Sequence, residues 1–135
     1  MLHLEFNSDS ENEGIARIVT SAYIMRFDPD MEEMEDVKTA VSEAVTNCIV
    51  HAYFDENGKI EMDISDKEQI VKIEITDHGI GIPDVKKAME PMYTTKPEEE
   101  RTGMGFSFME AFMDEVHVYS KEGEGTKVIM ERRII

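Results

Sequence analysis

Three polar residues in the first half of the chain have the spacing of one helix face. Glu43, Asn47 and His51 lie four residues apart, which aligns them along the surface of a helix. At this spacing a carboxylate is able to orient a nucleophile, and an amide oxygen is able to coordinate Mg²⁺. A solvated helix face is the simpler interpretation. Two alanines and a valine are interleaved with the trio, however, and a second layer that covers a ligand would explain this mixture.

A second group of residues follows a predicted strand. Asp77-x-Gly79-x-Gly81 combines one carboxylate with two glycines, which let a ligand approach the backbone closely. The carboxylate is able to accept a hydrogen bond from an exocyclic amine such as that of adenine. A turn that ends the strand is the alternative, and the motif alone does not decide between the two.

A third group precedes a predicted helix near residue 105. Thr94-Thr95-Lys96-Pro97 is followed by Arg101-Thr102-Gly103-Met104-Gly105. Backbone N–H groups at a helix N-terminus bind anions, and Lys96 and Arg101 would add positive charge. Taken alone, the segment is better explained as an ordinary glycine-rich helix cap. Other phosphate-binding and hydrolase motifs are absent from the sequence, and the four histidines lack the paired spacing of a zinc site.

Composition narrows the class of protein. With 135 residues the chain is long enough for one domain, and 30 acidic against 14 basic residues give a net charge of −16. Such a surface repels nucleic acid and suits a basic partner, although solubility alone explains the charge. The single cysteine, Cys48, allows no internal disulfide. No apolar run reaches the ~18 residues of a membrane span, and the start does not resemble a signal peptide. We therefore expect a cytoplasmic protein that binds neither membrane nor nucleic acid directly.

The hydrophobic pattern predicts an α+β fold. Strand 2–6 is followed by a helix that begins with a capping box at Ser8-x-x-Glu11, and its expected apolar face is Ile15, Ile18, Val19, Ala22 and Met25. A longer helix begins at Asp30, with Glu33 completing its capping box, and runs to about Tyr53. The remaining predictions are strands around 60–64 and 71–75, a short helix over 84–89, a loop over 90–103, a helix over 105–113, and strands 116–120 and 126–132. This order predicts a two-layer sandwich with helices on one face of a mixed sheet.

The three groups of residues, taken together and in this order, resemble a known set of motifs. Glu43-x-x-x-Asn47, Asp77-x-Gly79-x-Gly81 and Gly103-Met104-Gly105 are similar to the N, G1 and G2 boxes of the GHKL superfamily of ATPases and kinases. The segments 41–47 and 94–106 resemble more closely the anti-sigma F factors, a family of sporulation serine-protein kinases. The likeness covers nearly the whole chain, residues 1–135, and implies a single domain with the Bergerat ATP-binding fold.

The resemblance implies a role for each matching residue. Glu43 is the expected general base, Asn47 the Mg²⁺ ligand and Asp77 the acceptor of the adenine amino group. Gly79 and Gly81 are expected to line the base. An ATP lid is expected over about 90–105, with nucleotide-binding residues Thr95, Lys96, Arg101, Gly103, Met104 and Gly105. Arg17 is expected on the surface that meets the sigma factor.

The implied protein is a homodimeric anti-sigma factor that uses ATP and Mg²⁺. It would hold a sigma F-like factor and phosphorylate a serine of an anti-anti-sigma protein of the STAS fold. Three alternatives stay open: an RsbW-like kinase for a stress-response sigma factor, the catalytic domain of a histidine kinase, and an ATP-gated binding module without kinase activity. The sequence lacks a helix with a phosphoacceptor histidine followed by acidic and polar partners, which disfavours the histidine kinase. A pure binding module does not need a general base, so the presence of Glu43 disfavours the ATP-gated binding module.

Overall fold

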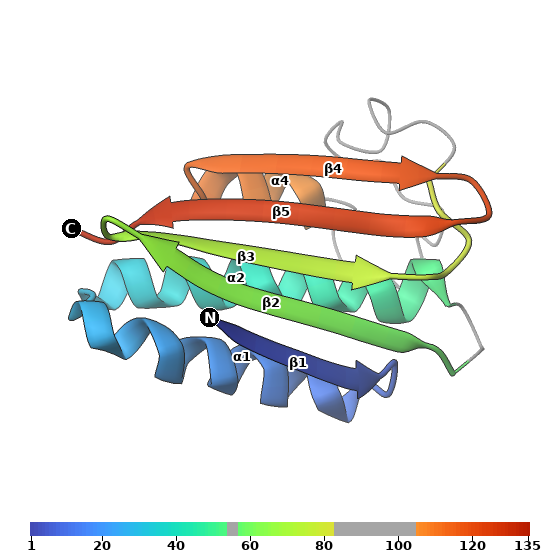
Figure 1. Ribbon diagram of the computed structural model, residues 1–135, viewed down its shortest axis with the longest axis horizontal. Coiled ribbons are helices and arrows are strands. Elements are labelled where there is room, and N and C mark those ends of the chain that lie inside the picture. Colours follow the sequence, from blue (N-terminus) through green and yellow to red (C-terminus); the bar gives the residue numbers. More distant parts are fainter. Residues whose placement is uncertain (54–56, 83–104) are drawn as a thin grey trace.

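The chain folds into one sheet covered on one face by helices (Figure 1). In the computed structural model, residues 1–53, 57–82 and 105–135 are described. Five strands lie in the order β1-β2-β3-β5-β4, with bounds β1 Leu2–Asn7, β2 Lys59–Lys67, β3 Ile70–Asp77, β4 Glu115–Lys121 and β5 Gly125–Arg133. The helical segments are α1 Glu11–Ile24, η1 Met25–Phe27, α2 Met31–Asn47, η2 Cys48–Ala52 and α4 Gly105–Phe112. The predicted two-layer α+β architecture is confirmed.

The sheet differs from the prediction in one respect. All four neighbouring strand pairs are antiparallel, so the sheet is not mixed in the described part of the chain. The two central hairpins, β2–β3 and β4–β5, have short connections, and antiparallel strands need no helical crossover. β3 and β5 then pair with each other and join the hairpins into one sheet.

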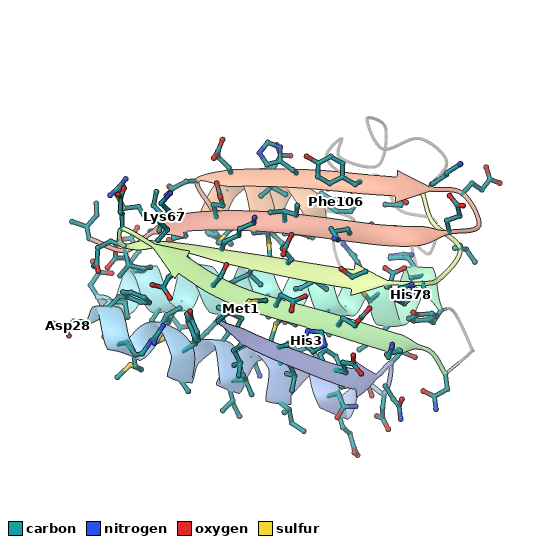
Figure 2. The ribbon with its side chains drawn as sticks, in the orientation of Figure 1. Met1, His3, Asp28, Lys67, His78 and Phe106 are labelled. Atoms are coloured by element: carbon teal, nitrogen blue, oxygen red, sulfur yellow. The ribbon has the colours of Figure 1, made fainter. Side chains whose placement is uncertain are left out.

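The core forms where the period-two pattern of the strands meets the helices. Alternate residues of the central strands are fully buried: Ile60, Met62, Ile64, Val71, Ile73 and Ile75. The residues between them are polar and face away from the helices, as an antiparallel sheet with one solvated face requires. Figure 2 shows these polar side chains spread over the face of the sheet opposite the helices.

Helix α2 is the central helix, and its start confirms the sequence prediction. The Asp30 carboxylate accepts from the Glu33 N–H at 2.7 Å, and the Glu33 carboxylate accepts from the Asp30 N–H at 3.0 Å, so both halves of the capping box are present. Its apolar residues Val37, Val41 and Val45 lie at helical spacing and are fully buried against the core. The other end of the helix differs, because the α-helix ends at Asn47 and a π-helical turn, η2, continues to Ala52.

Helix α1 contradicts two predictions. Ser8 does not cap it: Ser10 is the N-cap residue without a side-chain cap bond, the Asp9 carboxylate accepts from the Glu11 N–H, and the Ser8 hydroxyl accepts from the Gly58 N–H. The expected apolar face is confirmed only at Val19, which is half-buried and packs against the core. The residues that face the core are Ala16, Thr20 and Ile24, whereas Ile15, Ile18, Ala22 and Met25 are exposed. The inward stripe includes the small residues Ala16 and Thr20, which let this part of α1 approach its neighbours closely.

Polar contacts tie the layers together at the C-terminal end of the chain. The Arg132 guanidinium forms an ion pair with Asp36 of α2 at 3.0 Å and donates to the carbonyl of Phe112 in α4 at 2.6 Å. The Ile135 N–H donates to Glu33 at 2.7 Å, beside the capping box. Because Arg132 and Asp36 are both largely shielded from water, their contact joins the sheet to two helices with little solvent screening.

Several predictions are partly or wholly untested. The helix expected over 105–113 is α4, and Met109 and Met113 are buried in the core. The short helix over 84–89, the loop over 90–103 and most of the ATP lid over about 90–105 lie outside the described residues. The single-domain assignment stays a prediction. Among the described residues, no helix is long and apolar enough to cross a membrane.

The capping box provides a test of how α2 is anchored. We expect Asp30→Ala to lower the free energy of unfolding by about 1 kcal/mol, the usual value of an N-cap side chain. Asp30→Asn is the matched control, because asparagine caps helices as well as aspartate does. Urea denaturation of the three proteins measures the difference. Equal losses in the two variants, or none in Asp30→Ala, would contradict the anchoring role.

Candidate functional site

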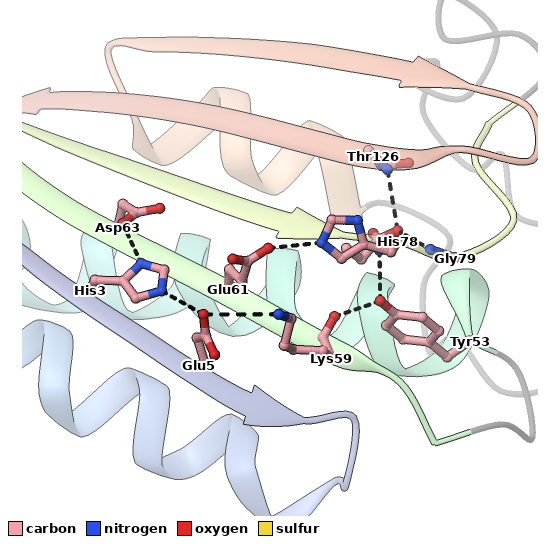
Figure 3. Close-up of polar contacts among 10 residues, drawn as sticks. His3, Glu5, Tyr53, Lys59, Glu61, Asp63, His78, Gly79 and Thr126 are labelled. Carbon is pink, nitrogen blue, oxygen red and sulfur yellow. Dashed lines mark hydrogen bonds and ion pairs between the residues drawn. The ribbon is translucent and has the colours of Figure 1, made fainter.

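The Asp77 carboxylate lies where a strand, a turn and a helix end meet. Asp77 is the last residue of β3, and only 4% of its surface is exposed. One of its oxygens accepts from the Gly79 N–H at 3.0 Å and from the Thr126 N–H of β5 at 3.2 Å (Figure 3). The thiol of Cys48, in the first position of η2, is also hydrogen-bonded to this carboxylate. Three separate segments therefore fix the position of one buried acid.

Burial and hydrogen bonding act on this acid in opposite directions. Desolvation raises the pKa of Asp77, while the N–H of Gly79, the thiol of Cys48 and the N–H of Thr126 stabilise the charged form and oppose that rise. The pKa of the Cys48 thiol is raised well above its ordinary value by burial and by the Asp77 charge. The thiol consequently stays protonated and acts as a donor to the carboxylate. A buried acid with a perturbed pKa at the end of a strand is typical of a functional site.

The glycines that follow Asp77 make room for the end of η2. The carbonyl of Ala52 accepts from the Ile80 N–H at 3.0 Å, and a Cβ atom on Gly79 would lie 2.2 Å from that same carbonyl oxygen. Gly81 has a φ of 77°, and a Cβ there would lie 2.2 Å from the carbonyl oxygen of Lys121. Glycine is therefore required at positions 79 and 81 for backbone packing, and the expected role of Gly79 and Gly81 in lining the base stays a prediction.

Four residues that the sequence analysis did not single out complete this junction. Cys48 and Thr126 hold the Asp77 carboxylate, as described above. The Tyr53 hydroxyl accepts from the His78 N–H at 2.6 Å and donates to the Lys59 carbonyl, so it connects η2 with β2 and the turn (Figure 3). A Cβ on Gly125, whose φ is 98°, would lie 2.2 Å from the Asp77 carbonyl oxygen. No sequence motif marks these residues, because each acts through strand pairing or through packing between distant segments.

The polar residues of the long helix lie at its C-terminal end, beside this junction. Glu43 and Asn47 are half-buried in the last turns of α2, and His51 is half-buried in η2. Asn47 immediately precedes Cys48, whose thiol contacts Asp77, so the end of α2 is placed next to the end of β3. The structure therefore brings Asn47 and Asp77 to the same end of the sandwich. The alignment with His51 is altered, because the π-helical turn changes the helical spacing after Asn47.

The remaining predicted site residues are placed only in part. Gly105 is the first residue of α4, as expected for a helix opened by a glycine motif. The other predicted phosphate contacts lie outside the described residues: Thr95, Lys96, Arg101, Gly103 and Met104. Arg17 is half-buried on α1, next to Ile18, which is 67% exposed.

The donor set fits a nucleotide with a divalent cation. A shielded carboxylate at the strand end is suited to accept from an amino group, because water does not compete strongly for it. The Asn47 amide oxygen is a hard ligand of the type that Mg²⁺ prefers. Glu43, one helical turn before Asn47, adds a carboxylate that is able to accept a proton.

Comparison with known proteins assigns the fold and then the family. Residues 6–132 match the family described as the histidine kinase-like ATPase domain. The anti-sigma F factor of Clostridium perfringens (strain SM101) is 51% identical over 134 residues, covering 98% of this chain and 96% of the relative. The anti-sigma F factor of Geobacillus kaustophilus is 46% identical over 134 residues, covering 98% of this chain and 92% of the relative. The chain belongs to the anti-sigma F factor family, as its motifs predicted.

Two solved structures share the fold. The RsbU and RsbW domains of a Mycobacterium tuberculosis protein match with a TM-score of 0.67 at 16% identity, covering 98% of this chain and 31% of that one. The catalytic domain of the histidine kinase ThkA matches with a TM-score of 0.61 at 22% identity, covering 99% and 97%. The Bergerat architecture expected from the sequence is thus confirmed, and the fold is shared by anti-sigma and histidine kinase domains.

The raised pKa of Asp77 predicts how stability depends on pH. Because the folded chain binds this proton more tightly than the unfolded chain, the contribution of Asp77 to stability falls as pH rises through its raised pKa. Asp77→Asn has no such titration. The free energy of unfolding of the variant minus that of the parent should therefore increase between about pH 4 and pH 7, starting in the ordinary aspartate range. Urea denaturation across this range measures it, and a constant difference would refute the desolvation of Asp77.

Proposed function

We propose that this protein is an ATP- and Mg²⁺-dependent serine-protein kinase that also sequesters a sigma F-like factor. Its substrate is a STAS-type anti-anti-sigma protein. The observation that supports the proposal is the hydrogen bond between Cys48 and Asp77, which joins the end of α2, where Glu43 and Asn47 lie, to the carboxylate that we propose as the adenine acceptor. Family membership supports the anti-sigma role, because relatives covering nearly the whole chain carry that name.

The chemistry required of these residues is mainly positioning. Phosphoryl transfer depends on holding the nucleotide and neutralising developing charge, with little covalent work for the protein. In this proposal Asp77 accepts from the adenine amino group, and Asn47 is a ligand of Mg²⁺, which neutralises phosphate charge when bound. Glu43 accepts the proton from the serine hydroxyl of the substrate. The half-buried position of Glu43 strengthens its action, because limited access of water lowers the local dielectric constant.

Helix α1 is the proposed surface for protein partners. Its exposed stripe of Ile15, Ile18 and Met25 presents apolar side chains to water, a feature typical of interaction sites. Arg17 lies between two of these residues and supplies a guanidinium, a group enriched at binding hot spots. We assign this surface to the sigma factor. A homodimer and a cytoplasmic location are further parts of the proposal.

A second candidate function is that of an RsbW-like kinase for a stress-response sigma factor. The match to a structure that contains an RsbW domain shows the shared fold, and the site residues are compatible with both. These relatives all carry the name anti-sigma F factor, which favours a sigma F-like partner. Pull-down with each class of sigma factor from the same genome decides between the two.

Two substitutions separate the proposed roles on α2. Glu43→Gln keeps the size of the side chain but does not accept the serine proton, so phosphorylation should fall about 10²–10⁴-fold, the usual contribution of a general base. Binding of ATP and sigma factor should be retained. Asn47→Ala should instead weaken binding of ATP·Mg²⁺ and any sigma binding that depends on it. Transfer of labelled phosphate to the STAS protein and calorimetry with ATP measure the two effects.

The outcome distinguishes a kinase from a binding module. If Glu43→Gln phosphorylates the STAS protein at the parent rate, the general-base role is wrong. If the parent itself binds ATP·Mg²⁺ and sigma factor but transfers no phosphate, the chain is an ATP-gated binding module.

The adenine assignment has its own test. Asp77→Asn replaces a carboxylate acceptor with an amide that presents a donor as well, and the lost charge-assisted bond is worth about 1.5–3 kcal/mol. ATP affinity should fall accordingly, by roughly 10- to 150-fold. Glu74→Gln on the outer face of the sheet is the matched control, since it also removes one negative charge. Equal ATP affinity in parent and Asp77→Asn would eliminate the adenine role.

A further inference from the structure

A group of histidines and carboxylates lies on the outer face of the sheet, away from the helices (Figures 2 and 3). The register of β1 on β2 places Glu5 directly opposite Glu61, and His3 directly opposite Asp63. Two carboxylates opposite each other in an antiparallel pair repel and destabilise the pairing unless a cation lies between or beside them. The pairing of β1 with β2 therefore favours a positive group at this point.

His3 is oriented as a metal-binding histidine is. Its Nδ1 lies 2.6 Å from an Asp63 oxygen, and its Nε2 lies 3.0 Å from a Glu5 oxygen. Both ring nitrogens are thus hydrogen-bonded to carboxylates, and release of the Nε2 proton would leave Nδ1–H donated to Asp63 and make Nε2 available to a metal ion. A carboxylate behind the second nitrogen is the usual partner of a metal-ligating histidine, because it fixes the tautomer and raises the basicity of the ligand.

We propose that His3 Nε2, Glu5 and Glu61 form a binding site for a divalent transition-metal ion such as Zn²⁺. Their candidate ligand atoms all lie within 4.8 Å of one another. A tetrahedral ion with bonds of about 2.0–2.1 Å holds its ligands about 3.3 Å apart, so the side chains need to close by at most roughly 1.5 Å. All three side chains retain access to solvent, which permits this movement and leaves the fourth position to water.

The ligand types select the kind of metal. Imidazole nitrogen suits zinc, copper and nickel, whereas Mg²⁺ prefers an all-oxygen octahedron. The site is therefore separate from the Mg²⁺ position proposed at Asn47. Glu61 also accepts from a second histidine, since the His78 Nε2 lies 2.8 Å from Glu61 Oε2. His78 directly follows Asp77, so the bound ion would be connected through Glu61 and His78 to the turn of the nucleotide site.

Protons and one lysine compete for the same carboxylates. The pKa of His3 is raised by its hydrogen bonds to Glu5 and to Asp63, so a proton occupies Nε2 at low pH. Lys59 Nζ lies 4.0 Å from the Glu5 oxygen and His78 lies beside Glu61. A metal ion must therefore compete with these groups for Glu5 and Glu61.

Calorimetric titration of the tag-free, nucleotide-free full chain tests the site. The parent should bind one equivalent of Zn²⁺, whereas Mg²⁺ alone should give no saturable heat. His3→Ala should weaken Zn²⁺ binding at least ~10-fold, and Asp63→Asn should weaken it by about 10- to 100-fold, the usual effect of losing the partner behind a ligating histidine. His117→Ala is the matched control, because His117 is also an exposed histidine on the outer face of the sheet, but its Nε2 lies 3.9 Å from Glu115 and not within hydrogen-bond distance of two carboxylates.

The outcomes separate a built site from surface binding. Retained affinity in His117→Ala together with a loss in His3→Ala and Asp63→Asn supports the site. Absence of saturable Zn²⁺ binding to the parent, equal affinity in His3→Ala, or an equal loss in His117→Ala overturns it. The Zn²⁺ affinity of Glu61→Gln is a further measurement of the site. Thermal unfolding without metal verifies that each variant is folded. Zn²⁺ should raise the melting temperature of the parent and not of His3→Ala.

Discussion

The burial of one carboxylate, Asp77, governs the arrangement of the whole site. An ionised acid is stable away from water only when donors replace its hydration, and here the donors come from the turn at Gly79, from β5 at Thr126 and from η2 at Cys48. Their position requires that β3, β5 and the end of α2 meet at one point. The cost of desolvation remains visible in the raised pKa of Asp77. A buried acid that carries such a cost is typical of a functional site.

Close backbone packing around Asp77 explains why glycine occupies both sides of it. Gly79 lies against the Ala52 carbonyl and Gly125 against the Asp77 carbonyl, and in both positions a Cβ would come within 2.2 Å of an oxygen atom. The glycines therefore bring the segments together, and the hydrogen bonds to Asp77 hold them. The π-helical turn contributes as well, because it directs the Ala52 carbonyl to the Ile80 N–H. π-turns occur frequently at functional sites, where they reorient one helix turn.

Local patterns predicted most of the fold, and they singled out Asp77, whose nucleotide role stays a prediction. The strands were predictable from alternation, as at Ile60–Ile64, and the start of α2 from the Asp30 capping box, because both signals depend on residues a few positions apart. The buried face of α1 was not predictable, since helical periodicity does not reveal which of two apolar stripes meets the sheet. Contacts made by Cys48, Tyr53 and Thr126, and the approach of His3 to Glu61, depend on strand register and on segments far apart in the sequence. Spacing along the chain, the basis for dismissing a zinc site, does not detect ligands that come together across strands.

The two halves of the proposed function are joined by one contact between helices. The Ser42 hydroxyl donates to the Glu13 carboxylate, and these residues lie next to Glu43 on α2 and one turn before Arg17 on α1. The exposed stripe of α1 faces away from the core, while Glu43 lies near the nucleotide end of α2. Because Val37, Ala40 and Ala44 are fully packed between the layers, α1 has little freedom to move relative to α2. A partner bound on α1 is therefore held in a fixed position relative to the proposed base. The small residues at this packing surface are as necessary to that geometry as the polar residues are to the chemistry.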